Sequence, residues 1–206
     1  MKTFIKATLL LLMLMVSIQP AFSIDPISPG NQELNDIIIS PPRVPIPEGY
    51  QCYVLFLFPS AEWIDKNKNA ELSSLFDVFK NFGEAIGNRR AAIWFTKWTK
   101  TDVDINRSKE YCDKFSLNYN DGPYIIVIGK HPAEISTGNV VVIKLSNIST
   151  SRITSILNIL EQDLRTERQI QKRALLFEEV KQRLLSAVDR HGKELKDIGI
   201  KLVFSK

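Results

Sequence analysis

Residues 54–63 read Val-Leu-Phe-Leu-Phe-Pro-Ser-Ala-Glu-Trp, and the next four residues are Ile-Asp-Lys-Asn. The near-continuous apolar run from Cys52 to Phe58 is typical of a strand that is covered on both faces. Pro59 and Ser60 end this run, and Ala-Glu-Trp opens the segment that follows it. The stretch therefore predicts a central strand that leads directly into a turn and a helix.

Working outward from this strand, the apolar pattern predicts a helix over 70–86 and a second buried strand over 91–96. The apolar face of that helix consists of residues at helical spacing: Leu72, Leu75, Phe76, Phe79, Phe82 and Ile86. Ser108 is expected to cap a short helix. Further strands are predicted at 124–128 and 140–145, and a further helix begins near Ser149 or Thr150.

The order of elements over residues 52–164 is strand, helix, strand, helix, strand, strand, helix, and this order resembles the thioredoxin fold. Ala61-Glu62-Trp63 after the first strand and Pro123 before the third strand support the resemblance. The expected fold class is α/β, a thioredoxin-like mixed sheet flanked by helices, with an additional C-terminal helix. The resemblance also implies a cis bond between Gly122 and Pro123.

Active members of that family carry two cysteines in the turn after the first strand, whereas this chain has Ile64 and Asn67 at those places. Thiol–disulfide exchange requires a thiolate and a second sulfur nearby, so this turn lacks the chemistry. In active relatives the same surface receives an extended polypeptide, and the resemblance implies a peptide-binding surface without exchange. The candidate residues are Trp63, Ile64, Asp65, Lys66, Asn67 and Pro123.

The N-terminus has the pattern of a secretory signal peptide. Lys2 and Lys6 precede an apolar run, Leu9–Val16, and Ala21-Phe22-Ser23 offers a cleavage site after residue 23. The run is shorter than the roughly 20 residues that cross a bilayer, so we expect no transmembrane segment after cleavage. We therefore expect a periplasmic or secreted protein. The alternative is that the N-terminal segment is not cleaved and serves as a membrane anchor.

Four regions are expected along the chain. The signal peptide, 1–23, is followed by a proline-rich leader or linker, 24–48, in which Ile37-Ile38-Ile39 has the composition of a short edge strand. The thioredoxin-like domain covers 49–164. The C-terminal extension, 165–206, is expected to hold a helix and a short strand at 200–204.

The C-terminal helix has an apolar stripe that fits either of two roles. The stripe packs back on the domain, or it forms a surface for a partner or a second copy of the chain. The residues of this candidate partner helix are Ile170, Phe177, Val180, Leu184 and Val188.

The chain has two cysteines, Cys52 and Cys112. In an oxidising compartment an even number of cysteines favours a disulfide, and we expect these two to form a structural bridge. Two free thiols, or a reactive pair in a thiol-disulfide oxidoreductase, are the alternatives. A separation of about 60 residues does not have the close spacing of a redox motif.

Composition and motifs exclude several other functions. Without Lys2 and Lys6 the formal net charge falls from +4 to +2, so we expect no nucleic-acid partner. His131 and His191 are not surrounded by a Cys or His cluster, so no metal or other cofactor is expected. Trp98 lies just past the second strand, where it either packs or offers a contact surface.

These observations predict an exported, non-enzymatic protein that binds a protein or peptide partner, in envelope assembly or in a chaperone-like role. Two alternatives remain at this point. The first is an oxidoreductase that uses Cys52 and Cys112, and the second is a structural component assembled through its C-terminal helix.

Overall fold

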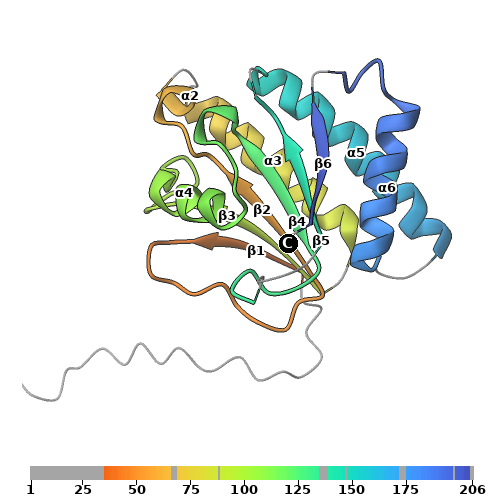
Figure 1. The fold of residues 1–206 in the computed structure, drawn as a ribbon, viewed down its shortest axis with the longest axis horizontal. Helices are drawn as coiled ribbons and strands as arrows, with labels where there is room; N and C mark the ends of the chain where they lie inside the picture. The colour runs from red at the N-terminus through yellow and green to blue at the C-terminus, as the bar shows by residue number, and fades with distance from the viewer. Residues whose placement is uncertain are drawn as a thin grey trace, which may run out of the picture. The chain divides into compact units, whose positions relative to one another are not determined.

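The computed structural model describes residues 35–65, 69–87, 89–134, 139–146, 148–171, 175–196 and 198–204, all of them in the unit Glu33–Lys206. The signal peptide expected at 1–23 lies outside these residues. The elements, in chain order, are β1 (Asn35–Ser40), β2 (Cys52–Leu57), α2 (Ala61–Asp65), α3 (Asn69–Ile86), β3 (Arg90–Phe95), α4 (Ile105–Lys114), the 3₁₀ helix η1 (Tyr119–Asp121), β4 (Tyr124–Ile128), β5 (Asn139–Lys144), α5 (Thr150–Gln171), α6 (Phe177–Arg190) and β6 (Gly199–Phe204) (Figure 1).

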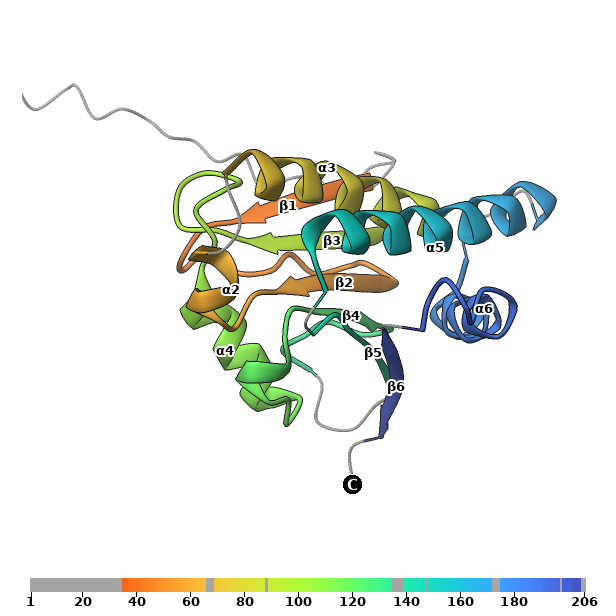
Figure 2. The same ribbon diagram turned by 90° about the horizontal axis from the view of Figure 1, so that it is seen from above.

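A six-stranded mixed sheet organises the fold, with the strand order β1-β3-β2-β4-β5-β6. β1, β3 and β2 are parallel, whereas β4, β5 and β6 are each antiparallel to the strand before them in the sheet. Helices cover both faces, with α3 and α5 side by side on one and α4 on the other (Figure 2). The expected fold class, a thioredoxin-like α/β fold with an additional C-terminal helix, is confirmed.

The proline-rich segment contributes to this sheet. The strand expected around Ile37–Ile39 is present as β1, at the edge beside β3. Residues 41–51 then return to β2 without a helix, because prolines at this density oppose one. Ile46 anchors this connection in the core that also contains Tyr53. The connection runs over one face and α3 returns over the other in the opposite direction, so both crossovers have the same hand.

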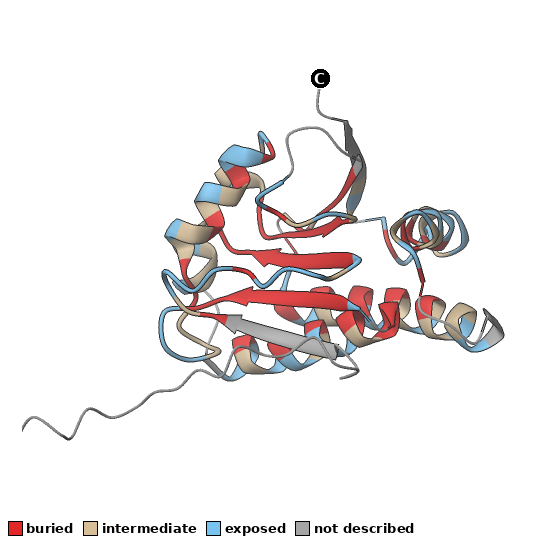
Figure 3. Ribbon diagram, turned by 90° about the horizontal axis from the view of Figure 1, so that it is seen from below, coloured by how far each residue is buried: buried red, intermediate tan, exposed pale blue. Residues whose placement is uncertain are grey.

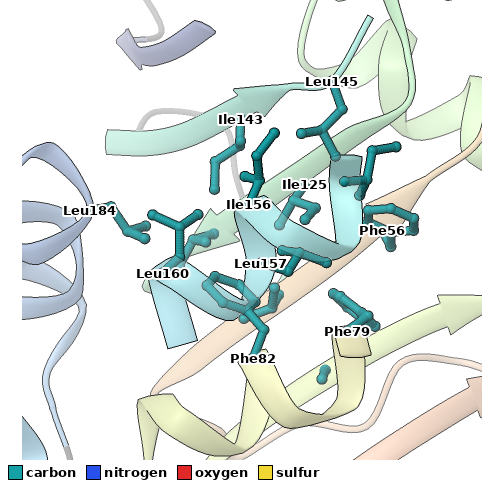
Figure 4. Packing of buried hydrophobic residues seen from close by; sticks show 14 of the residues in the cluster. Phe56, Phe79, Phe82, Ile125, Ile143, Leu145, Ile156, Leu157, Leu160 and Leu184 are labelled. Carbon is teal, nitrogen blue, oxygen red and sulfur yellow. The ribbon is translucent and has the colours of Figure 1, made fainter. Parts of the chain in front are cut away.

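Two hydrophobic cores lie on the two faces, and the strands alternate between them. Val54 and Phe56 of β2 belong to the first core, under α3 and α5, whereas Leu55 and Leu57 belong to the second, under α4. Figure 3 shows the central strands buried along their length. Figure 4 shows the first core, in which side chains from the sheet and from α3, α5 and α6 meet.

The short helix after β3 begins earlier than the sequence indicated. Asp104, not Ser108, is the N-cap of α4, and its Oδ1 accepts a hydrogen bond from the Arg107 N–H at 3.1 Å. Ser108 lies inside the helix, where its side chain is fully buried. Ser149 has the capping role expected near α5, since its Oγ accepts from the Arg152 N–H at 3.3 Å.

The C-terminal helix packs back on the domain. Val180 and Leu184 are buried in the first core, and Phe177 and Val188 pack against that core with partial exposure. The side chain of Ile170 lies outside the described ones. Val180 and Leu184 are thus unavailable to a partner, so of the two roles left open for the stripe, these residues have the packing role. A helix that packs on its own domain and a helix that binds a partner have the same apolar periodicity. The sequence pattern therefore does not specify which surface the stripe contacts.

Ion pairs and a strand complete this attachment. Arg190 Nη2 lies 3.1 Å from Asp163 Oδ2, and Arg183 pairs with Glu167, so α6 is linked to α5 at two levels. The short strand expected at 200–204 is present as β6, which pairs with β5. Within the described ranges, none of the helices combines the length and the apolar character that a membrane crossing requires.

We expect Leu184→Ala to lower the free energy of unfolding by about 2–5 kcal/mol, because it leaves a cavity between α6 and the first core. Urea denaturation measures this change. Gln182→Ala, at an exposed position on the same helix, is the matched control and should change stability by less than about 0.5 kcal/mol. Equal stability of both variants would contradict the docking of α6.

Candidate functional site

The candidate site lies at the edge of the sheet where β1, β2 and β3 end and β4 begins, which we call the carboxyl edge. Because the first three strands are parallel, the segments that follow them meet at this edge, and antiparallel β4 starts there. Ligands of open α/β sheets bind outside the carboxyl ends of the strands. The two parts of the predicted binding surface, the turn after β2 and the loop before Pro123, therefore share one edge.

The turn after β2 is tightly anchored. The Phe58 N–H donates to Ser108 Oγ of α4 at 3.1 Å, and Ser60 Oγ accepts from the Trp63 N–H at 3.4 Å in the first turn of α2. The Trp63 ring lies 5.4 Å from the Phe58 ring, centroid to centroid, and is partly buried. Ile64 is partly buried against the first core, so much of the predicted surface faces inward.

Of the described residues of the predicted binding surface in this turn, Asp65 is the exposed one. Lys66 and Asn67, which complete the predicted surface, lie outside the described residues. Trp63 and Ile64 therefore mainly pack α2 against the first core, whereas the Asp65 side chain lies at the surface.

The loop before β4 contacts this turn. The Gly122–Pro123 bond is cis, as the resemblance implied. Pro123 is buried, and its C=O accepts a hydrogen bond from the Leu145 N–H at 2.9 Å. Gly122 packs against Pro59, because a Cβ at Gly122 would lie 2.6 Å from Pro59 Cγ. Glycine is thus required for the close approach of the two segments.

Gly122 is also a backbone site that sequence reasoning missed. It is buried, and its N–H follows the 3₁₀ helix η1 as the C-cap, whereas within the described part of the chain its C=O has no hydrogen-bond partner. An unpaired buried backbone group costs free energy, and an incoming chain is one way to satisfy it. The sequence does not reveal the contact with Pro59. A glycine directly before Pro123 was nevertheless a usable signal of a close backbone approach at this position.

The two cysteines are free, and the predicted disulfide between them is wrong. Cys52 opens β2, at the end opposite the carboxyl edge, and belongs to the first core. Cys112 lies on α4 and belongs to the second core, on the other face of the sheet. The count of cysteines favoured a bridge, but the sheet separates the two side chains.

Neither thiol has the properties of an exchange catalyst. Burial raises the pKa of Cys52 to about 12, against the opposing charge of Arg90. Burial also raises the pKa of Cys112 to about 12, and the neighbouring Asp113 carboxylate adds to the shift. A reactive cysteine requires the opposite, a lowered pKa and access to solvent. The described residues also contain no group of three or more side chains placed to hold a metal ion.

β3 ends in an aromatic cluster. Trp94 is fully buried and stacks on Phe56 with centroids 5.2 Å apart. Trp98, by contrast, is 84% exposed, so of its two predicted roles the structure leaves the contact surface. The Trp94 indole N–H donates to the Lys100 C=O at 2.9 Å and fixes the loop that carries Trp98.

No protein-family model matches the chain, and neither a curated protein nor a solved structure gives a significant match. The class of protein is therefore defined by the fold and by the geometry of the carboxyl edge.

Both thiols should react with Ellman's reagent when the protein is unfolded without reductant, and neither should react rapidly in the folded protein at about pH 8. The reason is that each is free and protonated inside a core. Thiol counting with and without prior reduction measures this. Thiols that appear only after reduction would establish a bridge and contradict the structure.

Thr96, at the end of β3, is fully buried, and its Oγ1 has no hydrogen-bond partner among the described residues. Thr96→Val keeps the shape and removes the unpaired hydroxyl. We therefore expect the free energy of unfolding to rise by about 1 kcal/mol, measured by urea denaturation. A loss of stability would show that the hydroxyl is satisfied, for example by a buried water.

Proposed function

We propose that this chain is an exported thioredoxin-like protein without redox activity, which holds an extended segment of a protein or peptide partner at its carboxyl edge. Its cellular role would be in envelope assembly or as a chaperone-like factor in the periplasm or outside the cell. The signal-peptide pattern of residues 1–23 supports export.

The observation that carries the proposal is the backbone of Gly122. Its unpaired C=O adjoins the Pro59 turn at the edge where β4 begins. An extended peptide supplies an N–H to such a group, as in other cases of binding by main-chain hydrogen bonds. This mode requires no sulfur, so it is compatible with Ile64 and Asn67 at the family's cysteine positions.

The two alternatives have less support. An oxidoreductase would need an accessible thiolate with a second sulfur in reach, whereas Cys52 and Cys112 are buried in separate cores. Assembly through the C-terminal helix would need its apolar stripe at the surface, whereas Val180 and Leu184 are buried. Burial also protects two free thiols from oxidation, so their free state is consistent with export.

The proposal is tested by site-specific photo-crosslinking in the cell envelope of the source organism. A photoreactive amino acid replaces Asp65, at the carboxyl edge, or Lys130, which is exposed beyond the opposite end of β4. We expect a discrete adduct from position 65 and none from position 130, because the partner lies along one edge only. Mass spectrometry then identifies the partner, which is purified for binding measurements.

Two glycine variants make the binding test specific. A Cβ at Gly122 would meet Pro59 Cγ at 2.6 Å, and one at Gly83 would meet Ala92 Cβ at 2.7 Å, inside the first core. Gly122→Ala should therefore weaken partner binding roughly tenfold or more, whereas Gly83→Ala should only lower stability. Circular dichroism establishes a temperature at which both are folded.

Equal adducts from positions 65 and 130, or equal loss of binding in both glycine variants, would contradict the proposal. So would insulin-reduction activity that Cys112→Ser abolishes, because it would identify a catalytic thiol.

A further inference from the structure

Two neighbouring turns of the carboxyl edge each present an exposed apolar side chain. Val44 is 44% exposed in the turn after β1, and Trp98 is 84% exposed in the loop after β3. The turns are adjacent because Ser40 pairs with Phe95 and the Thr96 N–H donates to the Ser40 C=O at 3.3 Å. Both exposed apolar side chains therefore belong to the same edge of the sheet, where they are candidates for an interaction surface.

The first of these turns is held in shape by Arg107 of α4. Its guanidinium donates to Ser40 Oγ at 2.8 Å and to the C=O groups of Pro41 and Val44 at 2.8 and 2.7 Å. The same group lies 4.9 Å from the centroid of the Phe95 ring. The Arg107 guanidinium thus holds the turn together, while the side chains of Arg43 and Val44 remain exposed.

The second loop is equally fixed. The Lys97 N–H donates to the Asp102 C=O at 2.7 Å, and Thr96 forms a β-bridge with Val103, so the loop is closed at its base. The buried Trp94 indole binds the Lys100 C=O from beneath. Lys100 Nζ is itself engaged, 3.6 Å from Asp77 Oδ1. The loop therefore holds Trp98 at the surface in a fixed backbone conformation, and little backbone conformational entropy is lost when a partner contacts it.

Each of these two exposed apolar residues directly follows a cationic residue in the sequence. Arg43 precedes Val44, and Lys97 precedes Trp98. Both cations are exposed, and within the described residues neither forms an ion pair or a side-chain hydrogen bond. Arg43 holds this place with a positive φ of 69°, a conformation that non-glycine residues seldom adopt. We call these four exposed side chains of the two neighbouring turns, Arg43, Val44, Lys97 and Trp98, the Trp98 platform.

We propose that the Trp98 platform docks an acidic polypeptide segment, with one apolar side chain of the segment against Trp98 and its carboxylates beside Lys97 and Arg43. Tryptophan and arginine are the residues that dominate protein interfaces. An anionic membrane is disfavoured as the occupant, because a flat anionic surface would face the whole edge, including the exposed carboxylates of Glu62 and Asp65, whereas a short acidic segment contacts the platform alone. The inference rests on the proposed function in taking the ligand to be a polypeptide, but it uses different residues.

The test selects short random peptides, displayed on phage, against the purified protein. We expect the selected sequences to be enriched in Asp and Glu next to an aromatic or aliphatic residue. A synthetic peptide of the consensus should bind with a blue shift of tryptophan fluorescence, and Trp98→Ala should weaken it roughly tenfold or more. Added salt should weaken it further, because exposed charges are screened.

Charge reversal gives the sharpest outcome. The double variant Arg43→Glu, Lys97→Glu should select peptides enriched in Lys and Arg instead, because only the sign of the platform has changed. Both side chains are exposed, so thermal unfolding is expected to match that of the natural chain. A consensus that stays acidic, or one that is never enriched in charge, would overturn the proposal.

Gly122→Ala separates this inference from the proposed function. If Gly122→Ala abolishes binding of the consensus peptide and Trp98→Ala leaves it unchanged, the platform proposal is overturned and the Gly122 site is supported. The reverse pattern would support the platform alone. Binding of the protein to phosphatidylglycerol vesicles through Trp98, without selection of acidic peptides, would also overturn the proposal, since the occupant would be a lipid surface.

Discussion

Burial of β2 on both faces is the constraint on which the rest of the structure depends. All six of its residues are buried, and their side chains alternate between the two cores. One face therefore requires α3 and α5, and the other requires α4 and the extended connection that contains Ile46 (Figure 2). Because β2 pairs with parallel β3 on one side and antiparallel β4 on the other, the turn after it lies between the Trp98 loop and Gly122.

The sequence indicated much of this core, since continuous apolar runs and helical spacing directly reflect burial. The helix expected over 70–86 is α3, and the strand expected over 124–128 is β4. The predicted disulfide was wrong because a count of cysteines does not specify a face of the sheet. The C-terminal helix could not be assigned to core or partner, because either environment selects the same stripe, and contacts such as Arg190–Asp163 decide between them.

The candidate site was predictable only in part. Trp63 and Pro123 were named from a local resemblance, and the turn and loop that carry them do meet through Pro59 and Gly122. The unpaired C=O of Gly122 and the exposure of Trp98 depend on contacts between distant parts of the chain. Arg107, for example, fixes a turn 67 residues earlier, and no periodicity in the sequence reports such a contact. Local patterns therefore find the elements, whereas the functional surface arises from their tertiary arrangement.

The proposed role follows from an edge that lacks sulfur chemistry and offers groups for binding. Both cysteines lie in the cores, and the edge offers backbone groups, an exposed indole and free cations. This account requires that the sheet beneath the edge does not open locally, since a mobile β2 would not fix either turn.

Native-state hydrogen exchange of the β2 amides, followed by NMR, tests this requirement most directly. We expect Val54 to Leu57 to exchange only through global unfolding, with an opening free energy equal to that from urea denaturation. Exchange of these amides through a local opening of much lower free energy would show that β2 is not the fixed centre of the sheet, and would contradict the account.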